Sequence, residues 1–345
     1  MNAKPTVDKP TFVAAEFLIG YRDLTRSLGG NPELFLEQAG LKPSVLDQVS
    51  ARIPLELFSD VLETTAEALD CPDFGMRLAE IQSNRPFAPL DRLISNAPTI
   101  GDVIALGCGY SEAYTSGITS FLERDKDSGI AFLRVEYPEP LAGKIQLIEQ
   151  FALLGHNGII RLSGGKARAR GIWFLHAPCA PPVAYARQFR TPIRFRQDIH
   201  GLFFSDADMR TQVIGRDEGV FQKERELFAA RLPEQPMPIE MRVRLAVERA
   251  FVEGSCTRER VAELTEMHER TLHRRLAAAG TSFQEIREQV RRKLALRYLA
   301  QPDLPLTDVT GRLGYSELAV LTRSCKRWFK TPPAELRRRL THAAH

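Results

Sequence analysis

The spacing of hydrophobic positions changes near residue 238. From there to the end of the chain, apolar residues recur at helical spacing, as Val243, Val247 and Phe251 do, which is typical of amphipathic helices. Upstream, helical stretches alternate with short apolar runs rich in β-branched and aromatic residues, which favour strands. The pattern predicts an α+β N-terminal domain followed by an all-α C-terminal domain.

Boundary signals place the elements of the N-terminal domain. Asn31 followed by Pro32 starts a short helix, Thr99 is the expected N-cap of another, and Gly129 closes a hairpin turn. We therefore expect helices at about 32–39, 54–69, 99–115 and 141–162, and strands at about 118–124, 130–137, 171–176 and 201–205.

A proline-rich stretch separates the two domains. Pro233, Pro236 and Pro238 disfavour helix and favour an extended linker. The predicted boundaries are an N-terminal domain at 1–232, a linker at 233–238 and a C-terminal domain at 239–345.

The C-terminal domain contains a repeated unit. With an offset of 48 residues, Val261 aligns with Val309 and Arg275 aligns with Arg323. Each copy predicts a helix-turn-helix, at about 257–279 and 307–330, and a long helix at about 282–300 connects them. The expected helix caps are Thr257, Ser282 in a capping box with Glu285, Thr307 and Ser316.

The helix after the first turn has basic side chains opposite its apolar stripe. Leu272 and Leu276 are one helical turn apart and must face the core, which leaves Arg270, His273 and Arg274 on the outer face. Side chains at the start of such a helix reach base edges in the major groove, and the arginine fork matches guanine. We therefore predict base contacts from these three residues. The predicted contacts to the DNA backbone are Arg275, Thr322, Lys326, Arg327, Lys330, Arg337 and Arg338.

The charge distribution separates the domains in the same way. From Pro238 onward there are 21 Lys and Arg against 13 Asp and Glu, a net charge of +8. The remainder has 26 basic and 30 acidic residues, a net charge of −4. The positive C-terminal domain favours a polyanionic partner such as double-stranded DNA, and the N-terminal domain does not.

The remaining composition is that of an ordinary globular protein. No apolar run approaches the roughly 20 residues that a membrane span needs, and the N-terminal residues have no signal-peptide pattern. The cysteines are far apart and form no CxxC pair. We expect a cytoplasmic protein with reduced cysteines and no membrane partner.

Several motifs occur in a fixed order in the C-terminal domain: Arg270-Thr271-Leu272-x-Arg274-Arg275-Leu276, Gly280-Thr281-Ser282-Phe283, Leu313-Gly314-Tyr315-Ser316 and Lys326-Arg327-Trp328. Through them, residues 240–340 resemble the DNA-binding domain of the AraC/XylS family of bacterial transcription regulators. The resemblance implies promoter DNA and RNA polymerase as partners. It implies base contacts from Arg270, His273 and Arg274 in the first unit and from Arg323 in the second.

The sequence departs from the family pattern in both units. Glu266 and Lys330 occupy positions where the family usually has glycine, and His268 replaces a capping serine. The second recognition helix starts with the apolar run Leu318-Ala319-Val320. We therefore expect the second unit to act chiefly as a clamp on the DNA backbone, with Arg323 as its one base reader.

The N-terminal domain carries a second set of motifs, including Arg52-Ile53-Pro54-Leu55, Phe74-Gly75-x-Arg77-Leu78 and Pro192-Ile193-Arg194-Phe195. With these, residues 15–230 resemble the arabinose-binding-type sensor domain that precedes the reader in one subgroup of that family. The resemblance implies sensing of a small-molecule effector, or dimerisation, and gives no reason to expect arabinose. The candidate pocket residues are aromatic and polar side chains near the predicted sheet: Phe87, Tyr110, Tyr114, Gln150, Trp173 and His176.

Catalytic alternatives lack their required patterns. Gly164-Gly165-Lys166 has no upstream glycine and no following Ser or Thr, so it is not a phosphate loop. The histidines have no metal-ligand spacing, and no nucleophile–base pair is evident. We expect no catalytic residue, metal or cofactor. The leading hypothesis is an effector-controlled, homodimeric transcription activator; the alternatives are a repressor of the same family, or an enzyme whose basic domain tethers it to nucleic acid.

Overall fold

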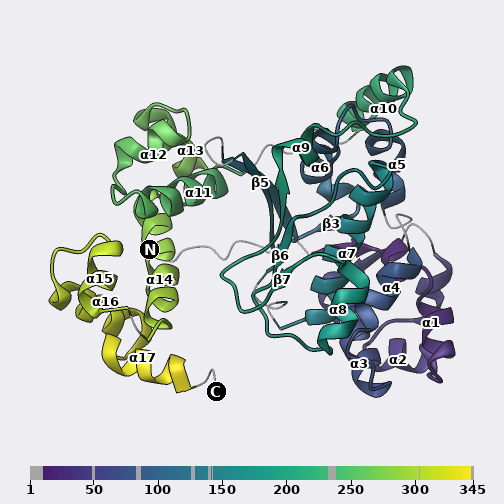
Figure 1. Ribbon diagram of the computed structural model, residues 1–345, viewed down its shortest axis with the longest axis horizontal. Coiled ribbons are helices and arrows are strands. Elements are labelled where there is room, and N and C mark those ends of the chain that lie inside the picture. The colour runs from purple at the N-terminus through teal and green to yellow at the C-terminus, as the bar shows by residue number, and fades with distance from the viewer. Residues whose placement is uncertain are drawn as a thin grey trace. The chain divides into compact units, whose positions relative to one another are not determined.

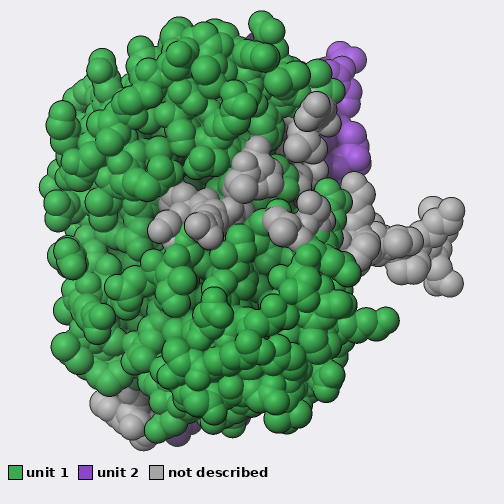
Figure 2. Space-filling view, turned by 90° about the vertical axis from the view of Figure 1, so that its right-hand side faces the viewer, with its two compact units in different colours: residues 1–235 green, residues 236–345 purple. Residues whose placement is uncertain are grey.

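The computed structural model describes residues 11–48, 51–82, 87–125, 129–138, 141, 143–231, 238–302 and 304–342. The chain divides into two compact units, residues 1–235 and 236–345, which Figure 2 shows in different colours. Of the predicted linker at 233–238, only Pro238 lies within the described residues. The first unit is α+β and the second is helical, with no strand among residues 238–302 and 304–342, so the predicted fold class is confirmed.

The first unit contains two sheets. The smaller has the order β2-β1-β3, and its central strand is antiparallel to both neighbours. The larger has the order β4-β5-β8-β6-β7 and is antiparallel except between β6 and β7. The strands are β1 (Phe12–Ala14), β2 (Arg52–Pro54), β3 (Thr115–Ser116), β4 (Thr119–Asp125), β5 (Ile130–Glu136), β6 (Gly171–Trp173), β7 (Ile193–Arg194) and β8 (His200–Ser205).

The helices of the first unit lie on one face of the larger sheet (Figure 1). The long helix α7 crosses the middle of the unit and packs against α3, α4 and β8. The helices are α1 (Tyr21–Ser27), α2 (Pro32–Gln38), α3 (Leu55–Ala68), α4 (Phe74–Gln82), α5 (Ala88–Ile94), α6 (Ile100–Gly109), α7 (Ile145–Leu162), α8 (Pro182–Phe189), α9 (Asp206–Arg210) and α10 (Glu218–Arg231).

Close approach of α4 to α7 depends on Gly75. A Cβ at this position would lie 2.1 Å from the backbone oxygen of Gln146. The Gln146 side chain uses the same gap: its Oε1 accepts a hydrogen bond from the Gly75 amide (2.8 Å), and its Nε2 donates to the Pro72 carbonyl (2.9 Å). The glycine of the Phe74-Gly75 motif therefore has a packing role rather than a turn role.

Several predicted elements of the first unit are confirmed. The Asn31 side chain caps α2 by accepting from the Leu34 amide, and Thr99 forms a capping box with Asp102 at the start of α6. Strands β4 and β5 pair as the predicted hairpin, with Leu122 opposite Leu133. The predicted helix at 54–69 is α3.

Other boundaries were wrong. The helix expected to reach residue 115 ends at Gly109, because the following residues form a 3-10 turn and Thr115 pairs with Val13 in the small sheet. The helix expected from 141 begins only at Ile145, where Glu63 of α3 accepts a hydrogen bond from the Gln146 amide (2.8 Å). The strand predicted at 171–176 ends at Trp173.

The second unit is organised around one long helix. Helix α14 runs between the α12–α13 pair at one end and the α15–α16 pair at the other (Figure 1). The helices are α11 (Ile239–Val252), α12 (Arg258–Leu264), α13 (Glu269–Ala278), α14 (Phe283–Leu299), α15 (Leu306–Arg312), α16 (Leu318–Phe329) and α17 (Pro333–His342). A single hydrophobic core draws residues from both helix-turn-helix units.

Three helix caps differ from the predictions. Thr307 is not an N-cap, because α15 starts directly after Pro305, whose φ of −55° and ψ of 144° already lead into the helix. Ser316 lies one residue before the actual N-cap of α16, Glu317, which makes no side-chain capping bond. Ser282 does cap α14, yet the Glu285 carboxylate accepts from the hydroxyls of Thr281 and Ser282. Thr257 caps α12 as predicted.

Candidate DNA interface and ligand cavity

The turn between α12 and α13 is tied to two neighbouring helices. Thr265 is buried, and its hydroxyl donates to the Val261 carbonyl at 2.8 Å. Its own carbonyl accepts from Arg242 Nη2 of α11 at 2.7 Å, and the Met267 amide donates to the Ala262 carbonyl at 2.9 Å. The polar Thr265 is thus satisfied inside the core, and Arg242, which sequence reasoning missed, holds the turn.

Two non-glycine residues adopt left-handed backbone conformations in this unit. Glu266 has φ +55° in the first turn, and Lys330 has φ +57° at the end of α16. Both are positions at which the family resemblance leads one to expect glycine. A side chain with a Cβ costs roughly 1–2 kcal/mol there, so each position carries backbone strain that a glycine would not.

The outer face of α13 presents four basic side chains. Arg270, His273, Arg274 and Arg275 are all exposed, whereas Leu272 and Leu276 are 1% exposed and face the core. None of these four side chains forms an ion pair or hydrogen bond with another residue that the structure describes. The face is therefore open to a polyanion.

Helix α16 presents a different surface. Leu318 is 41% exposed and Ala319 is also exposed, so its N-terminal end is apolar. Arg323 and Lys326 are exposed further along the helix. Leu321 and Cys325 are fully buried on its inner face. The Thr322 hydroxyl donates to the Leu318 carbonyl at 2.9 Å and is already used within the helix.

Several of the basic residues expected at the DNA backbone have partners inside the protein, Arg338 among them. Arg327 forms an ion pair with Glu288 of α14, and Trp328 Nε1 donates to the same carboxylate at 3.0 Å. Arg337 Nη1 donates to the Pro302 carbonyl at 3.4 Å. Lys330 is exposed at the end of α16, and Arg338 is exposed on α17.

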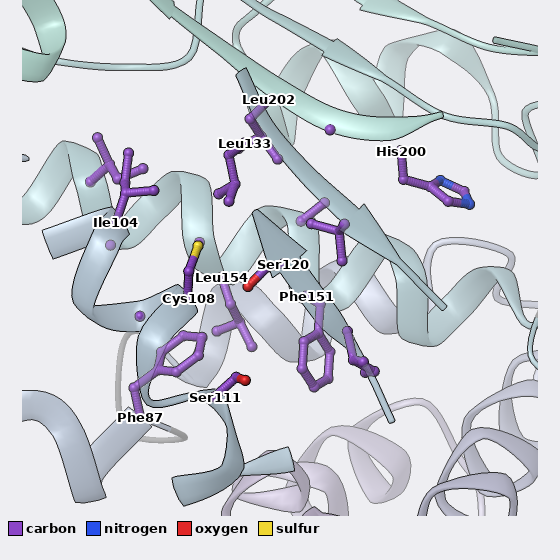
Figure 3. Close-up of a pocket in the computed structure, with 18 of the residues that line it drawn as sticks. Phe87, Ile104, Cys108, Ser111, Ser120, Leu133, Phe151, Leu154, His200 and Leu202 are labelled. Atoms are coloured by element: carbon purple, nitrogen blue, oxygen red, sulfur yellow. The ribbon is translucent and has the colours of Figure 1, made fainter. Parts of the chain in front are cut away.

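The first unit contains a cavity of about 150 Å³ between α5, α6 and α7 and the inner face of the larger sheet. The sheet contributes Ser120, Leu133 and Leu202, and the helices contribute Ile104, Cys108 and Leu154 (Figure 3). A cavity of this size can hold a small organic molecule, because an apolar cavity of about 150 Å³ takes a benzene ring.

The lining of the cavity is mostly apolar. Its polar groups come from Cys108, Ser111, Thr115 and Ser120, from Tyr114 and Tyr137, and from His200. Burial raises the pKa of the Cys108 thiol to about 11, and the neighbouring Ser120 side chain offsets this only in part. The thiol is therefore neutral at physiological pH.

Two of the six candidate pocket residues line this cavity. These two are Phe87 and Tyr114, whose rings make an edge-to-face contact with their centroids 5.2 Å apart. The other four have different surroundings. Tyr110 packs on Phe228, Trp173 packs on Phe203, and Gln150 donates to the Phe17 carbonyl and to the Gln82 side chain. Large aromatic and polar side chains were thus an incomplete guide to the cavity.

The last of the six candidate pocket residues, His176, belongs to a separate polar cluster around Glu149 of α7. Its Nε2 lies 3.8 Å from Glu149 Oε1, and Tyr185 donates its hydroxyl hydrogen to the same oxygen at 2.6 Å. The Cys179 Sγ lies 3.7 Å from Glu149 Oε2. Glu149 is fully buried, and burial raises its pKa to about 8 against an ordinary value of 4.5.

The described residues hold no group of three or more His, Cys, Asp or Glu side chains suited to bind a metal ion. In the same part of the chain, no helix has both the length and the apolar character needed to cross a bilayer.

Comparison with known proteins finds a match for each unit. The family model for the N-terminal arabinose-binding domain of AraC transcription regulators matches residues 29–213, and a helix-turn-helix domain model matches residues 261–339. The HTH-type transcriptional regulator VirS of Mycobacterium tuberculosis is 34% identical over 338 residues, which cover 95% of this chain and 96% of that protein.

A more distant relative is also named as a regulator. The ornithine utilization regulator of Pseudomonas aeruginosa is 23% identical over 319 residues, covering 91% of this chain and 93% of its own. The solved structure of the transcriptional regulator CdpR from Pseudomonas aeruginosa aligns with 98% of this chain and all of its own, at 18% identity and a TM-score of 0.42, a similarity too low to support an argument. The relatives and matched domains are those of transcription regulators and not of enzymes.

Replacing Glu266 by glycine is expected to raise the free energy of unfolding of the C-terminal unit by about 1 kcal/mol, because it relieves the left-handed strain. The measurement is urea unfolding followed by Trp328 fluorescence in a Trp173→Phe background, which leaves no second tryptophan. The matched control is Ala278→Gly, an exposed position in α13. Because Ala278 is the last residue of α13, this control should lower stability by less than about 1 kcal/mol. A loss of stability in Glu266→Gly would contradict the strain.

Replacing Glu149 by glutamine is expected to flatten the dependence of stability on pH. Because the folded-state pKa is about 8, the folded protein holds a proton that the unfolded chain releases above pH 4.5. The free energy of unfolding of the wild type therefore falls as pH rises through this window, and the glutamine variant lacks that contribution. Thermal unfolding of both proteins between pH 5 and 8 tests this. Parallel curves would mean that Glu149 is ionised in the folded state.

Proposed function

The chain belongs to the AraC family of transcription regulators, and we propose that it is an effector-controlled activator that reads specific promoter sequences through its C-terminal unit. The C-terminal domain, residues 239–345, binds DNA. The N-terminal domain, residues 1–232, binds the effector and forms a homodimer. Bound DNA and RNA polymerase are the partners on which activation depends.

The observation that carries this proposal is the exposed basic face of α13. A helix whose apolar stripe is fully engaged and whose arginines have no partner among the described residues has its charges ready for phosphates and base edges. Arg270 and Arg274 are one helical turn apart on that face. We assign base contacts to Arg270, His273 and Arg274, with the guanidinium forks directed to guanines.

The second unit has a weaker reading surface. Its recognition helix starts with exposed Leu318 and Ala319 in place of polar readers, so Arg323 is its one proposed base contact. Apolar side chains contribute less to base discrimination than a bidentate arginine does. This unit is proposed to act chiefly as a clamp on the backbone.

Phosphate contacts are proposed for residues that flank both recognition helices. They position the protein on the duplex without reading sequence. Arg327 can reach a phosphate only if it exchanges its ion pair with Glu288 for that contact. The residues are Arg275, Thr322, Lys326, Arg327, Lys330, Arg337 and Arg338.

Effector control is supported by the cavity in the N-terminal unit. It is concave, largely apolar and bordered by a few polar groups, which are the usual properties of a small-molecule site. An effector that binds one conformational state more tightly than another shifts the protein toward that state. No observation specifically favours repression, which is the alternative outcome within the same family.

Arg274→Ala is expected to weaken binding to the cognate promoter by about 1–3 kcal/mol and to relax base preference at one position, because one bidentate contact to a base is lost.

Arg270→Ala is expected to cost more base discrimination than Arg323→Ala. Binding-site selection and gel-shift competition with mutated half-sites measure both effects.

The matched control is Arg249→Ala, which removes the same charge from α11, where Arg249 pairs with Glu253. It should leave base preference unchanged. An unchanged preference in Arg274→Ala would remove its assignment as a reader, and equal losses for Arg270→Ala and Arg323→Ala would refute the asymmetry between the units.

The direction of regulation is tested by transcription in vitro. A genome-wide footprint of bound sites supplies the promoter, and the purified protein is then added to that promoter with RNA polymerase. We expect more transcript with the protein than without it. Less transcript would identify a repressor.

A further inference from the structure

The cavity is bordered by two helices that each place a glycine in the middle of the facing stripe. On α7 the lining residues Ile148, Gly155 and Leu162 are two turns apart from one another. On α6 the lining residues Val103 and Gly107 are one turn apart, and Ser111 follows in the 3-10 turn after the helix. Each helix therefore has a glycine between the larger side chains that line the space, such as Cys108 on α6 and Leu154 on α7.

Neither glycine is explained by close packing or by backbone geometry. A Cβ built at Gly107 or Gly155 has no atom within 4 Å, and neither residue has a positive φ. Gly201 on β8 is the contrasting case, because a Cβ there would lie 2.3 Å from the Phe132 ring. Glycine inside a helix lowers its stability relative to alanine. At Gly107 and Gly155 that cost keeps space open in the core.

The surroundings of this space exclude charge. None of the described residues that line it is Asp, Glu, Lys or Arg. His200 Nδ1 accepts a hydrogen bond from the Leu175 amide (3.4 Å). A charged ligand would lose its hydration without gaining an ionic partner. A sugar would bring more hydroxyl groups than the lining can satisfy.

The surroundings also favour a ring. Tyr114 donates its hydroxyl hydrogen to the Gly107 carbonyl (3.0 Å), so its ring, and not its polar tip, is left to contact a ligand. The Phe87 ring contacts the Tyr114 ring edge to face. The Phe151 ring, which also lines the cavity, stacks on the Phe17 ring with the two centroids 4.4 Å apart. Aromatic groups in such arrangements favour a further aromatic partner. The side chains of Cys108, Ser111 and Ser120 gather near Phe87, while His200 lies apart from them (Figure 3).

We propose that this cavity binds an uncharged molecule about the size of one aromatic ring with a short side chain, and that its single hydroxyl or carbonyl group hydrogen bonds to the Ser111 and Ser120 hydroxyls. This rests on the proposed function of the N-terminal unit as the effector site. Gly107 and Gly155 set the size of ligand that fits.

The test uses the full chain and four probes: 2-phenylethanol, phenylacetate, 2-phenylethylammonium and L-arabinose. The first three share a ring and chain length and differ in charge. We expect 2-phenylethanol to raise the melting temperature and to bind in calorimetry, and the two ions and the sugar to do neither. Equal or stronger binding of an ion or of the sugar, or no binding of any probe, would overturn the proposal.

Variants at the glycines locate the binding. Gly155→Leu fills the space and should weaken 2-phenylethanol binding by at least about tenfold. Gly107→Ala adds a single methyl where no atom lies within 4 Å, so it tests the same point in a chain that keeps its fold. Gly311→Ala is the matched control, since Gly311 is in α15, also has open space, and does not line the cavity. Unchanged affinity in both cavity variants would place the ligand elsewhere.

The proposed function fails separately from this inference. If 2-phenylethanol binds the cavity but neither it nor any cell-derived ligand changes promoter binding, effector control is refuted while the ligand class stands. If a charged effector from the cell controls promoter binding through the same cavity, the regulator stands and the ligand class is refuted.

Discussion

The guanidinium of Arg291 lies over two aromatic rings from different parts of the C-terminal unit, 5.3 Å from Phe251 of α11 and 4.6 Å from Tyr315 in the second turn. It stands in the middle of α14, whose 17 residues span about 25 Å. One turn away, Glu288 binds Arg327 and Trp328 of α16. Through these contacts and the shared core, both helix-turn-helix units pack against α14, which separates them.

Both units contain features that lower their stability close to their candidate binding sites. The C-terminal unit accepts Glu266 and Lys330 in left-handed backbone conformations at the ends of helices, and the turns keep their shape because hydrogen bonds from neighbouring residues hold them. The N-terminal unit accepts glycines inside α6 and α7 and keeps an open space in its core. Strain and cavities of this kind are found where a protein must bind something.

The sequence predicted the long periodic elements and failed on short or cooperative ones. Helices such as α3 and α13 follow from their own spacing of apolar residues. Strand β3 does not, because Thr115 becomes a strand residue only by pairing with Val13, about a hundred positions away in the chain.

The candidate pocket was also only partly predictable from the sequence. Reasoning from large aromatic and polar side chains named Phe87 and Tyr114 but not Gly107 and Gly155, because the lining consists mostly of aliphatic and small residues. Paired glycines inside apolar helical stripes were the signal that could have found it.

We propose that the two helix-turn-helix units of one chain, joined by α14, contact successive turns on one side of the duplex, the first by reading bases and the second chiefly by clamping the backbone. The direct measurement is a hydroxyl-radical and methylation-protection footprint of the full chain on its operator. The account predicts, within each half-site, two protected segments about 10 base pairs apart on the same face of the DNA. A single protected groove per half-site, or two segments on opposite faces, would contradict it.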